Sequence, residues 1–338
     1  MMNRILVVNV NWIGDVIFSS PVFKALKKSY PKAEITCLAV PRVREILECI
    51  PQIDHILIYD ERGKDRSPFA KLSLIGKIRR QRFDAAFVLH RSLTRALLVC
   101  LAGIPVRVGY DEKGRGFLLT HPLKKVPGDL HRSDHYLRII EAAGIRVEDR
   151  TCELHPPDEA SRRAEELLRE AGVTPEEPFI VVNPGGNWNL KRWPKESYAR
   201  LIDGLSKEFK EKIIVSGSPD DVMLARDIAA LTVHKPVMLA GRTRLKELMA
   251  LMKMARLVIS ADSGPLHLAS SVGTAGIGIF GPTRPEITGP RGKGNFHVLT
   301  KDVGCNREPC YHLQCPDNIC MRSISEHEII DAVRQIQN

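Results

Sequence analysis

Residues that could do chemistry are concentrated in four short polar segments, each of which follows an apolar run typical of a buried strand. In the first segment, NVNWIGD (9–15), Gly14 permits a tight turn and Asp15 stands near the start of a helix. A carboxylate at this position can stabilise the helix terminus, or it can face a ligand and act as a general base. The residue types leave both roles open.

The second segment, PGGNWNLKRWP (184–194), places Gly186 and Asn187 close to the cations Lys191 and Arg192. It contains neither the G-K-[ST] ending of a Walker loop nor the dinucleotide fingerprint G-x-G-x-x-G. Glycines after a strand let the backbone approach a phosphate closely, and the two cations would add charge at the same place. We therefore expect an anion-binding turn, with a solvated pair of cations as the alternative.

The third segment, SGSPDD (216–221), ends in two acidic residues. Asp221 is well placed to cap the helix that follows, whereas in a nucleotide site it would accept hydrogen bonds from ribose hydroxyls. The residues alone do not decide between these two roles.

The fourth segment, SADSGPLHLA (260–269), is the most informative. Asp262 follows a strand, and the run Ser263-Gly264-Pro265 begins a helix, for which proline suits the first position. The amides at such a helix start form an anion site. His267 falls in the first helical turn, where it faces either this ligand or the protein core. FGPT (280–283) ends the next predicted strand with a second glycine turn, so the two turns could flank one ligand.

Two series of alternating strands and helices must position these segments. Short apolar runs, typical of strands buried on both faces of a parallel sheet, alternate with amphipathic stretches. The chain breaks at His155-Pro-Pro157, so we expect an α/β protein with an N-terminal domain (1–155), a C-terminal domain (156–323) and a last helix (324–338). The expected strands of the two doubly wound sheets are 5–10, 35–40, 55–59, 85–89 and 106–109, then 179–183, 212–216, 236–239, 257–260 and 276–280.

The composition limits the partners of the chain. Its 338 residues carry a net charge of +10, and no window approaches the ~20 apolar residues of a membrane span. Lys and Arg outnumber Asp and Glu by 26 to 17 in residues 1–155, but only by 24 to 23 in the remainder. This basic first half is solvated surface or faces nucleic acid, anionic lipid or a phosphorylated acceptor; no nucleic-acid motif accompanies it. The N-terminus lacks a signal-peptide pattern, so we expect a cytoplasmic protein.

Four of the eight cysteines form a regular cluster in which each member stands five positions after the last: Cys305, Cys310, Cys315 and Cys320. This spacing differs from the C-x₂-C pairs of standard zinc sites. A structural zinc or iron site, two disulfides and free thiols all remain open, and disulfides are less favoured in a cytoplasmic protein. None of these arrangements would be catalytic.

Taken together, the four segments resemble glycosyltransferase family 9, the lipopolysaccharide heptosyltransferases. The resemblance rests on NWIGDVIFSSP, GGNWNLKRWP, ADSGPLHLA and FGPT, which span most of the chain; NWIGD and LKRWP are most similar to the heptosyltransferase II branch. It implies the GT-B architecture, in which two Rossmann-like domains face a central cleft and the last helix crosses back to the first domain. It also implies an inverting transfer of heptose from ADP-heptose, without a catalytic metal.

The same resemblance implies roles for individual residues. Asp15 matches the general base, Lys191 the lysine that stabilises the leaving diphosphate, and Asp262 the acid that holds hydroxyls of the donor sugar. Position 186 and position 187 are occupied by hydroxyl residues in some relatives, so contacts to phosphate there would come from the backbone of this chain. The other candidate donor contacts are Gly186, Asn187, Arg192, Asp221, Ser263, Gly264, Pro265 and His267.

The acceptor of the family is the phosphorylated, Kdo-bearing inner core on lipid A, which suits a basic first domain. The resulting candidates for acceptor contacts, each with solvated surface charge as its alternative, are Arg62, Lys64, Arg66, Arg91 and Arg95. We expect a monomer that works peripherally at the anionic inner leaflet of the membrane, with an ADP-sugar and a lipid-linked acceptor as partners and no nucleic acid.

Three alternative functions remain. One is a related transferase that uses another nucleotide sugar. Another is a non-catalytic nucleotide-binding protein whose cysteine loop binds a metal. A nicotinamide dehydrogenase is the third, and it is disfavoured because no G-x-G-x-x-G follows a strand.

Overall fold

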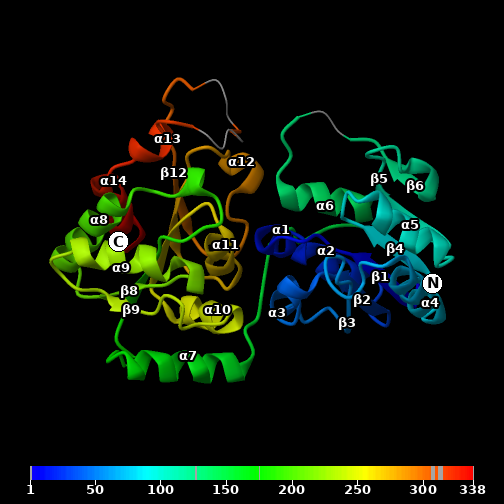
Figure 1. The fold of residues 1–338 in the computed structure, drawn as a ribbon, viewed down its shortest axis with the longest axis horizontal. Helices are drawn as coiled ribbons and strands as arrows, with labels where there is room; N and C mark the ends of the chain where they lie inside the picture. The colour runs from blue at the N-terminus through cyan, green and yellow to red at the C-terminus, as the bar shows by residue number, and fades with distance from the viewer. Residues whose placement is uncertain (1, 126–127, 175, 306–308, 311–314, 338) are drawn as a thin grey trace. The chain divides into compact units, whose positions relative to one another are not determined.

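The computed structural model describes residues 2–125, 128–174, 176–305, 309–310 and 315–337. The chain divides into two compact units, Met1–Leu154 and His155–Asn338 (Figure 1). Each unit contains one six-stranded sheet in which all described strand pairs are parallel. The predicted α/β class with parallel sheets is confirmed.

The first sheet has the strand order β3-β2-β1-β4-β5-β6. Its strands are β1 (Arg4–Val8), β2 (Glu34–Ala39), β3 (His55–Ile58), β4 (Ala85–Val88), β5 (Val106–Tyr110) and β6 (His121–Leu123). The helices of this unit are α1 (Ile13–Phe18), α2 (Ser20–Ser29), α3 (Arg44–Leu47), α4 (Pro68–Arg80), α5 (Leu93–Leu101) and α6 (Arg132–Glu141), with the 3₁₀ turns η1 (Pro41–Val43) and η2 (Gly116–Leu118).

The second sheet has the strand order β12-β11-β10-β7-β8-β9. Its strands are β7 (Phe179–Asn183), β8 (Lys212–Val215), β9 (Val237–Met238), β10 (Leu257–Ala261), β11 (Gly276–Ile279) and β12 (Phe296–Leu299). The helices of this unit are α7 (Asp158–Glu170), α8 (Lys195–Glu208), α9 (Val222–Leu231), α10 (Leu245–Met254), α11 (Gly264–Ser271), α12 (Pro285–Thr288), α13 (Ile319–Arg322) and α14 (Glu326–Gln337), with the 3₁₀ turns η3 (Asn189–Lys191) and η4 (Pro219–Asp221).

The central strands explain where a ligand would bind. β1, β4, β7 and β10 are almost entirely buried apolar runs, as strands covered on both faces must be. The strand order reverses between β1 and β4 in the first sheet and between β7 and β10 in the second. Ligands of doubly wound sheets bind beyond the carboxyl ends of the strands at this reversal. The polar segments 9–15, 184–194 and 260–269 follow β1, β7 and β10, so the fold places them at these two points.

Some elements differ from the sequence pattern. The apolar spacing predicts one helix over 16–29, whereas the structure contains α1 and α2 with Ser19 between them. Ser19 Oγ donates to the carbonyl oxygen of Val16 at 2.7 Å, and Pro21 has no N–H to continue the helical bonds. Five elements are absent from the predicted series: α6, the one-turn helices α12 and α13, and the edge strands β6 and β12, which are short and of mixed polarity.

The last helix packs within the second unit in the contacts that the structure gives for it. Arg200 Nε donates to Glu326 Oε1 at 2.7 Å, and Gln337 Nε2 donates to Glu211 Oε1 at 3.1 Å. These bonds join α14 to α8 and to the residues that follow α8. The crossing of 324–338 to the first unit stays a prediction. None of the helices in the described ranges combines the length and the apolarity that crossing a bilayer requires.

Candidate active site

Lys191 and Asp262 meet at the carboxyl end of the second sheet. Lys191 is the last residue of η3, which follows β7, and Asp262 directly follows β10. Lys191 Nζ lies 2.6 Å from Asp262 Oδ2, and the carboxylate side chain is only 3% exposed. The contact forms because β7 and β10 are neighbouring parallel strands that end at the same edge. The expected anion-binding turn and the expected donor carboxylate therefore lie together.

Three further side chains surround the Asp262 carboxylate. Thr283 Oγ1 and Thr288 Oγ1 donate to Oδ2 at 2.6 and 3.2 Å, and His267 Nε2 lies 3.3 Å from Oδ1. Burial alone would raise the pKa of Asp262, but the hydrogen bond from His267 and the charge of Lys191 outweigh it and hold that pKa well below its usual range. Asp262 is thus an ionised acceptor that hydroxyl groups of a sugar can bind.

His267 and Thr283 show what the sequence left undecided. His267 is 4% exposed, yet its ring faces Asp262, so it is buried and directed at the site at once. Thr283 had no predicted role of its own, although the FGPT segment that contains it was expected to flank the same ligand. Thr288, in α12, was not anticipated at all; its only signal was its position five residues after FGPT.

The glycines of the 184–194 segment allow neighbouring turns to come close. A Cβ atom at Gly185 would lie 2.4 Å from Asp221 Oδ2, so any larger residue there would force the Asp221 side chain to shift. A Cβ atom at Gly186 would be 3.8 Å from Ser263 Cβ, so this turn also adjoins the start of α11. Arg192 Nε donates to the carbonyl oxygen of Gly186 at 3.0 Å and so holds the loop. The backbone of the 184–194 segment and the backbone at the start of α11 therefore come close together near the charged Lys191 side chain.

The Asp221 carboxylate is hydrogen-bonded within its own turn. Its Oδ2 accepts hydrogen bonds from the Ser218 amide at 3.0 Å and the Ser218 hydroxyl at 2.6 Å, forming a capping box. Arg192 Nη2 lies 3.7 Å from Oδ1. The capping box belongs to η4, and the Asp221 side chain makes no capping hydrogen bond to α9, so the expected cap of the following helix is not formed. A ribose would have to use the remaining acceptor capacity of the carboxylate.

The start of α11 presents backbone donors beside this cluster. Ser263 is the N-cap residue, but no side chain of the described residues caps the helix. Its Oγ instead lies 3.2 Å from Ser260 Oγ. Pro265 occupies the first turn, as predicted. The first amides of an α-helix have no intrahelical acceptor, so they favour an anion. Asn187, in the facing loop, is exposed.

Asp15 lies in the first turn of α1, at the carboxyl end of the first sheet. Tyr136 Oη, from α6, donates to Asp15 Oδ1 at 2.8 Å, although the residues are 121 positions apart. Burial, and then the charge of Asp15, raises the pKa of Tyr136 well above its ordinary value, so its hydroxyl remains a donor at any ordinary pH. Sequence reasoning missed Tyr136 because α6 was not predicted; the amphipathic stretch RSDHYLRIIE was the available signal.

Arg95 differs from its expected role as an acceptor contact. Its side chain is fully buried, because it projects from α5 under the turn that follows β1. Nη1 donates to the carbonyl oxygen of Asn9 at 2.6 Å, Nη2 donates to Asn11 Oδ1 at 2.8 Å, and Glu61 Oε2 lies 3.4 Å away. Asn11 Nδ2 in turn donates to Glu61 Oε1 at 3.1 Å. Arg95 therefore fixes the turn that leads to Asp15 instead of offering a surface charge.

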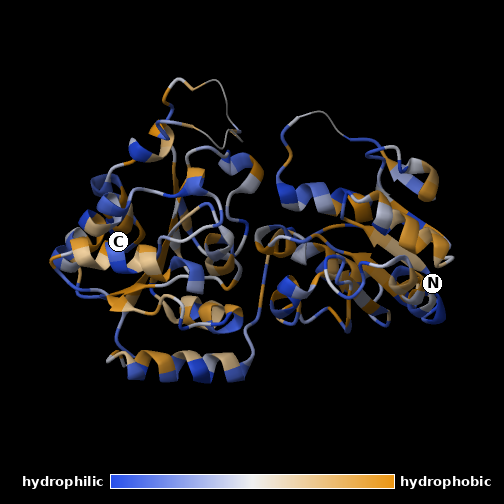
Figure 2. Cartoon of the chain, in the orientation of Figure 1, coloured by the Kyte–Doolittle hydropathy of each residue, from blue (hydrophilic) through white to orange (hydrophobic). Residues whose placement is uncertain are grey.

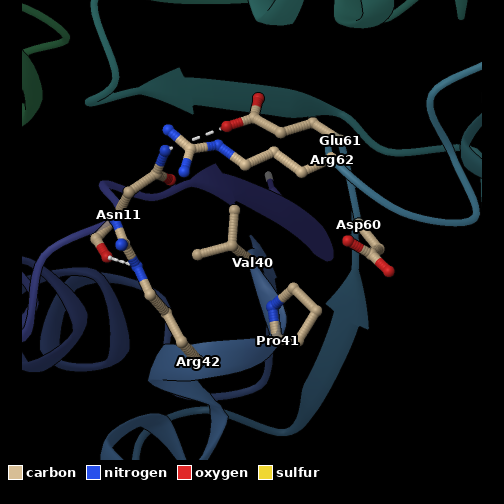
Figure 3. Close-up of a pocket in the computed structure, with 7 residues that line it drawn as sticks. All are labelled: Asn11, Val40, Pro41, Arg42, Asp60, Glu61 and Arg62. Carbon is tan, nitrogen blue, oxygen red and sulfur yellow. Dashed lines mark hydrogen bonds between the residues drawn. The ribbon is translucent and has the colours of Figure 1, made fainter.

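A pocket of about 240 Å³ opens above this network (Figure 3). Arg42 and Arg62 contribute its two cations, and Val40 and Pro41 contribute apolar lining. Arg42 Nε donates to the carbonyl oxygen of Asn11 at 2.7 Å, and its guanidinium stacks 4.2 Å from the ring centre of Trp12. The complete set of lining residues is Asn11, Val40, Pro41, Arg42, Asp60, Glu61 and Arg62. Arg42 was not among the expected acceptor contacts.

The other expected acceptor residues lie at the surface of the first unit. Lys64 and Arg66 are exposed in the loop that includes Arg62. Arg91 is exposed after β4, and its Nε forms a 3.1 Å ion pair with Glu112 Oε2. Only Arg62 of the five lines the pocket.

The expected metal site is not formed by the described residues. No group of three or more His, Cys, Asp or Glu side chains in the described ranges could hold a metal ion. No disulfide joins Cys305, Cys310, Cys315 or Cys320, which also leaves the disulfide alternative without support. Parts of the segments between these cysteines, 306–308 and 311–314, lie outside the described residues.

Comparison with known proteins decides the family. The model of "Glycosyltransferase family 9 (heptosyltransferase)" matches residues 71–318, which is most of the chain. The chain belongs to glycosyltransferase family 9. Among curated relatives of this glycosyltransferase, lipooligosaccharide heptosyltransferase 2 of Haemophilus ducreyi is 28% identical over 89% of this chain and 90% of its own length. Lipopolysaccharide heptosyltransferase 3 of Escherichia coli K12 is 30% identical over 80% of each chain.

Solved structures agree on the fold of this family 9 glycosyltransferase. A family 9 glycosyltransferase from Veillonella parvula aligns with a TM-score of 0.88 at 24% identity, over 99% of this chain and 97% of its own. The ADP-heptose lipopolysaccharide heptosyltransferase II of E. coli aligns with a TM-score of 0.80 at 23% identity, over 98% of each chain. The expected family, enzyme class and GT-B fold are confirmed, and the dehydrogenase alternative is removed.

Proposed function

We propose that this chain transfers heptose from ADP-heptose to the inner core of lipopolysaccharide, with inversion at the anomeric carbon. The relatives named above are heptosyltransferases of lipopolysaccharide or lipooligosaccharide, and they match 89% and 80% of the chain. The single observation that carries the proposal is the Lys191–Asp262 contact beside the start of α11. It combines a cation, backbone donors and an ionised carboxylate, which are the groups that a diphosphate-linked sugar needs.

In this proposal Asp15 starts the reaction as general base. Its carboxylate takes the proton of the attacking acceptor hydroxyl, and the oxygen of that hydroxyl forms a bond to the anomeric carbon of the heptose. Attack from the face opposite the diphosphate inverts that carbon. Tyr136 occupies one oxygen of Asp15 by hydrogen bonding and leaves the second oxygen to take the proton. A positioned base of this kind contributes about 10²–10⁴-fold to a rate.

The leaving group departs as the bond between the anomeric carbon and the phosphate oxygen breaks. The electron pair of that bond stays on the β-phosphate of ADP, where negative charge grows. Lys191 and the first amides of α11 would meet this charge, as preorganised donors do in other transferase sites. We propose that this arrangement supplies the stabilisation without a catalytic metal.

Asp262 would hold the sugar that is transferred. Because its carboxylate is buried and ionised, hydroxyl groups of the heptose can replace part of its present bonding to Lys191 and Thr283. His267 would keep the carboxylate oriented during that exchange. Arg192 and Asp221 join at 3.7 Å on the other side of the glycine turn and would border the nucleotide.

We propose that the acceptor binds to the first unit near the pocket of Arg42 and Arg62. The two guanidinium groups suit the carboxylate and phosphate groups of an acidic core sugar, and the exposed ring of Trp12 offers an apolar surface next to them. Lys64, Arg66 and Arg91 would add charge around the pocket. A lipid-linked acceptor implies that the enzyme works at the cytoplasmic face of the inner membrane.

The Asp15→Asn variant tests the proposed chemistry. It keeps the hydrogen bond from Tyr136 but cannot accept the acceptor proton, so we expect transfer to fall by about 10²–10⁴-fold. The affinity for ADP, measured by calorimetry, should stay unchanged because ADP would bind to the second unit. Asp331→Asn, at an exposed position of α14 in the second unit, is the control that should leave both quantities unchanged. Turnover of Asp15→Asn at the wild-type rate would remove Asp15 from the role of base.

A further inference from the structure

The first unit carries an exposed apolar surface that the proposed chemistry does not use. Eleven large apolar side chains are exposed in the described ranges, and six of them belong to α4, α5 and η2. Both α4 and η2 contact α5, so these elements are neighbours. We refer to the six side chains as the apolar face: Phe69 (84% exposed), Leu72 (61%), Leu93 (46%), Leu97 (40%), Leu101 (45%) and Phe117 (80%).

The leucines of the apolar face form a continuous stripe. Leu93, Leu97 and Leu101 are spaced four residues apart on α5, so they lie above one another on one side of the helix. The opposite side of α5 is also apolar, because Ala96 and Val99 are buried in the core of the first unit. Figure 2 shows α5 as hydrophobic along most of its length. A helix that is apolar on both sides usually has a partner on each.

Cations border this stripe without counter-charges on the same elements. The sequence of α4, PFAKLSLIGKIRR, contains four cations and no acid, and α5 contains no acid either. Arg79 Nη2 donates to the carbonyl oxygen of Leu101 at 2.5 Å, so the basic end of α4 lies against the end of the stripe. By contrast, α7 neutralises its own cations, as in the Arg163–Glu166 pair.

We propose that the apolar face and the cations of α4 dock onto the surface of an anionic lipid bilayer. Leucines and phenylalanines would enter the boundary between headgroups and acyl chains, while Lys77 and Arg80 would bind anionic headgroups. A second copy of the chain fits this surface less well, because a symmetric contact would bring the cations of two α4 helices together. The combination of exposed apolar side chains and cations therefore favours an anionic membrane over a second copy of the chain as the partner of this surface.

This inference rests on the proposed function, because a membrane surface is where a lipid-linked acceptor would be found. The exposed loop with Lys64 and Arg66 ends at Ser67, which is the N-cap residue of α4. Docking through α4 would therefore place the proposed acceptor loop directly at the headgroups. Because α4, α5 and the loop all belong to the first unit, the inference depends on that unit alone.

Binding of the full-length protein to lipid vesicles tests the inference without any substrate. Vesicles that contain phosphatidylglycerol should bind the protein, whereas vesicles of pure phosphatidylcholine should bind it at least about tenfold more weakly. The variant Leu93→Asn/Leu97→Asn/Leu101→Asn should bind the anionic vesicles at least about tenfold more weakly than the wild type. Its control is Met223→Asn/Leu231→Asn, two exposed apolar residues of α9, which should not change binding.

A second variant separates charge from apolar contact. Lys77→Gln/Arg80→Gln should weaken binding by about fivefold for each cation removed, and high salt should remove this difference. Lys207→Gln/Lys210→Gln, which replaces exposed lysines of the second unit, is the matched control.

Three outcomes would overturn the inference. They are wild-type binding by the leucine variant, equal binding of the wild type to neutral and anionic vesicles, and a wild-type dimer that the leucine substitutions dissociate. Transfer to a water-soluble, deacylated acceptor should stay at the wild-type rate in both variants. A protein that binds anionic vesicles but transfers no heptose would contradict the proposed function and leave the docking surface standing.

Discussion

Lys191 and Asp262, 71 positions apart in the sequence, form a direct ion pair with 2.6 Å between Nζ and Oδ2. The carboxylate is 3% exposed and the lysine side chain 20% exposed, so the pair is largely removed from water. In the proposed reaction one partner meets the diphosphate and the other holds the sugar. The two charges thus hold each other in place where the donor needs them, and donor binding exchanges their mutual contact for contacts to the ligand.

Replacing Asp262 by Asn should weaken both the fold and the donor site. The substitution leaves the largely buried Lys191 without its charged partner, so we expect the free energy of unfolding to fall by about 1–3 kcal/mol. Urea unfolding and the KM for the donor measure the two effects. Glu166→Gln, which removes an exposed partner of Arg163, is the control and should change neither quantity. An unchanged donor KM in Asp262→Asn would remove this residue from the donor site.

Replacing Lys191 by Met should act mainly on the chemical step. The departing diphosphate loses its cation, so we expect kcat to fall by about 10²–10³-fold. Lys191→Arg should restore part of the rate because the positive charge returns. Lys195→Met, which breaks an exposed pair with Asp227, controls for the loss of a lysine in the same region. If Lys191→Met lowered the rate no more than Lys195→Met, the proposed role of Lys191 would be wrong.

The Tyr136→Phe variant isolates the hydrogen bond to Asp15. Loss of this bond frees the Asp15 carboxylate to rotate, so we expect kcat to fall by about tenfold while the KM for the donor stays constant. Tyr198→Phe is a matched control: Tyr198 is equally buried, and its hydroxyl has no hydrogen-bond partner among the described residues. Equal kcat values in the two variants would show that Tyr136 only fills the core.

Two histidines of the first unit, the half-buried His90 and the buried His135, should make that unit sensitive to mild acid. Burial, followed by the charges of nearby arginines, lowers the pKa of His90 to about 3 and that of His135 to about 4. An unfolded chain binds protons at histidine near pH 6.5, so the unfolded state takes up more protons below that pH. The stability contribution of the neutral rings is therefore complete above about pH 6.5 and is lost as the pH falls toward 4.

Urea unfolding between about pH 7.5 and about pH 4.5 measures this loss. His135→Gln removes one of the two histidines. As the pH falls, the free energy of unfolding of this variant should therefore decrease about half as steeply as that of the wild type. His155→Gln, at an exposed position, should leave the slope unchanged. Equal slopes for the wild type and His135→Gln would contradict the assignment.

Removal of metal should leave transfer intact. The proposed mechanism assigns the growing phosphate charge to Lys191 and the amides of α11, so exhaustive treatment with EDTA should not lower kcat. Elemental analysis of the purified protein, and of a Cys305→Ser/Cys310→Ser variant, shows separately whether the cysteine segment binds zinc or iron. Loss of kcat on chelation, with the fold intact by circular dichroism and activity restored by a divalent ion, would overturn the metal-free mechanism.

The sequence could predict the fold and the position of the site because both depend on local signals. Buried parallel strands need continuous apolar runs, and polar turns after β1, β7 and β10 must lie at the carboxyl edges of their sheets. The bonding partners of individual side chains depend on distant residues. Tyr136 and Thr288 reach the carboxylates from elements far along the chain. Arg95 has the residue type of a substrate contact, and only the packing of α5 shows that it is buried.

The most direct test of the account is a transfer assay with a panel of nucleotide sugars. Purified protein would be incubated with a core-truncated lipopolysaccharide acceptor and ADP-heptose, ADP-glucose, UDP-glucose or GDP-mannose, and the product would be identified by mass spectrometry. The account predicts addition of one heptose from ADP-heptose, with the anomeric configuration inverted and with no product in Asp15→Asn. Efficient transfer from another donor in preference to ADP-heptose, or a product with retained configuration, would contradict it.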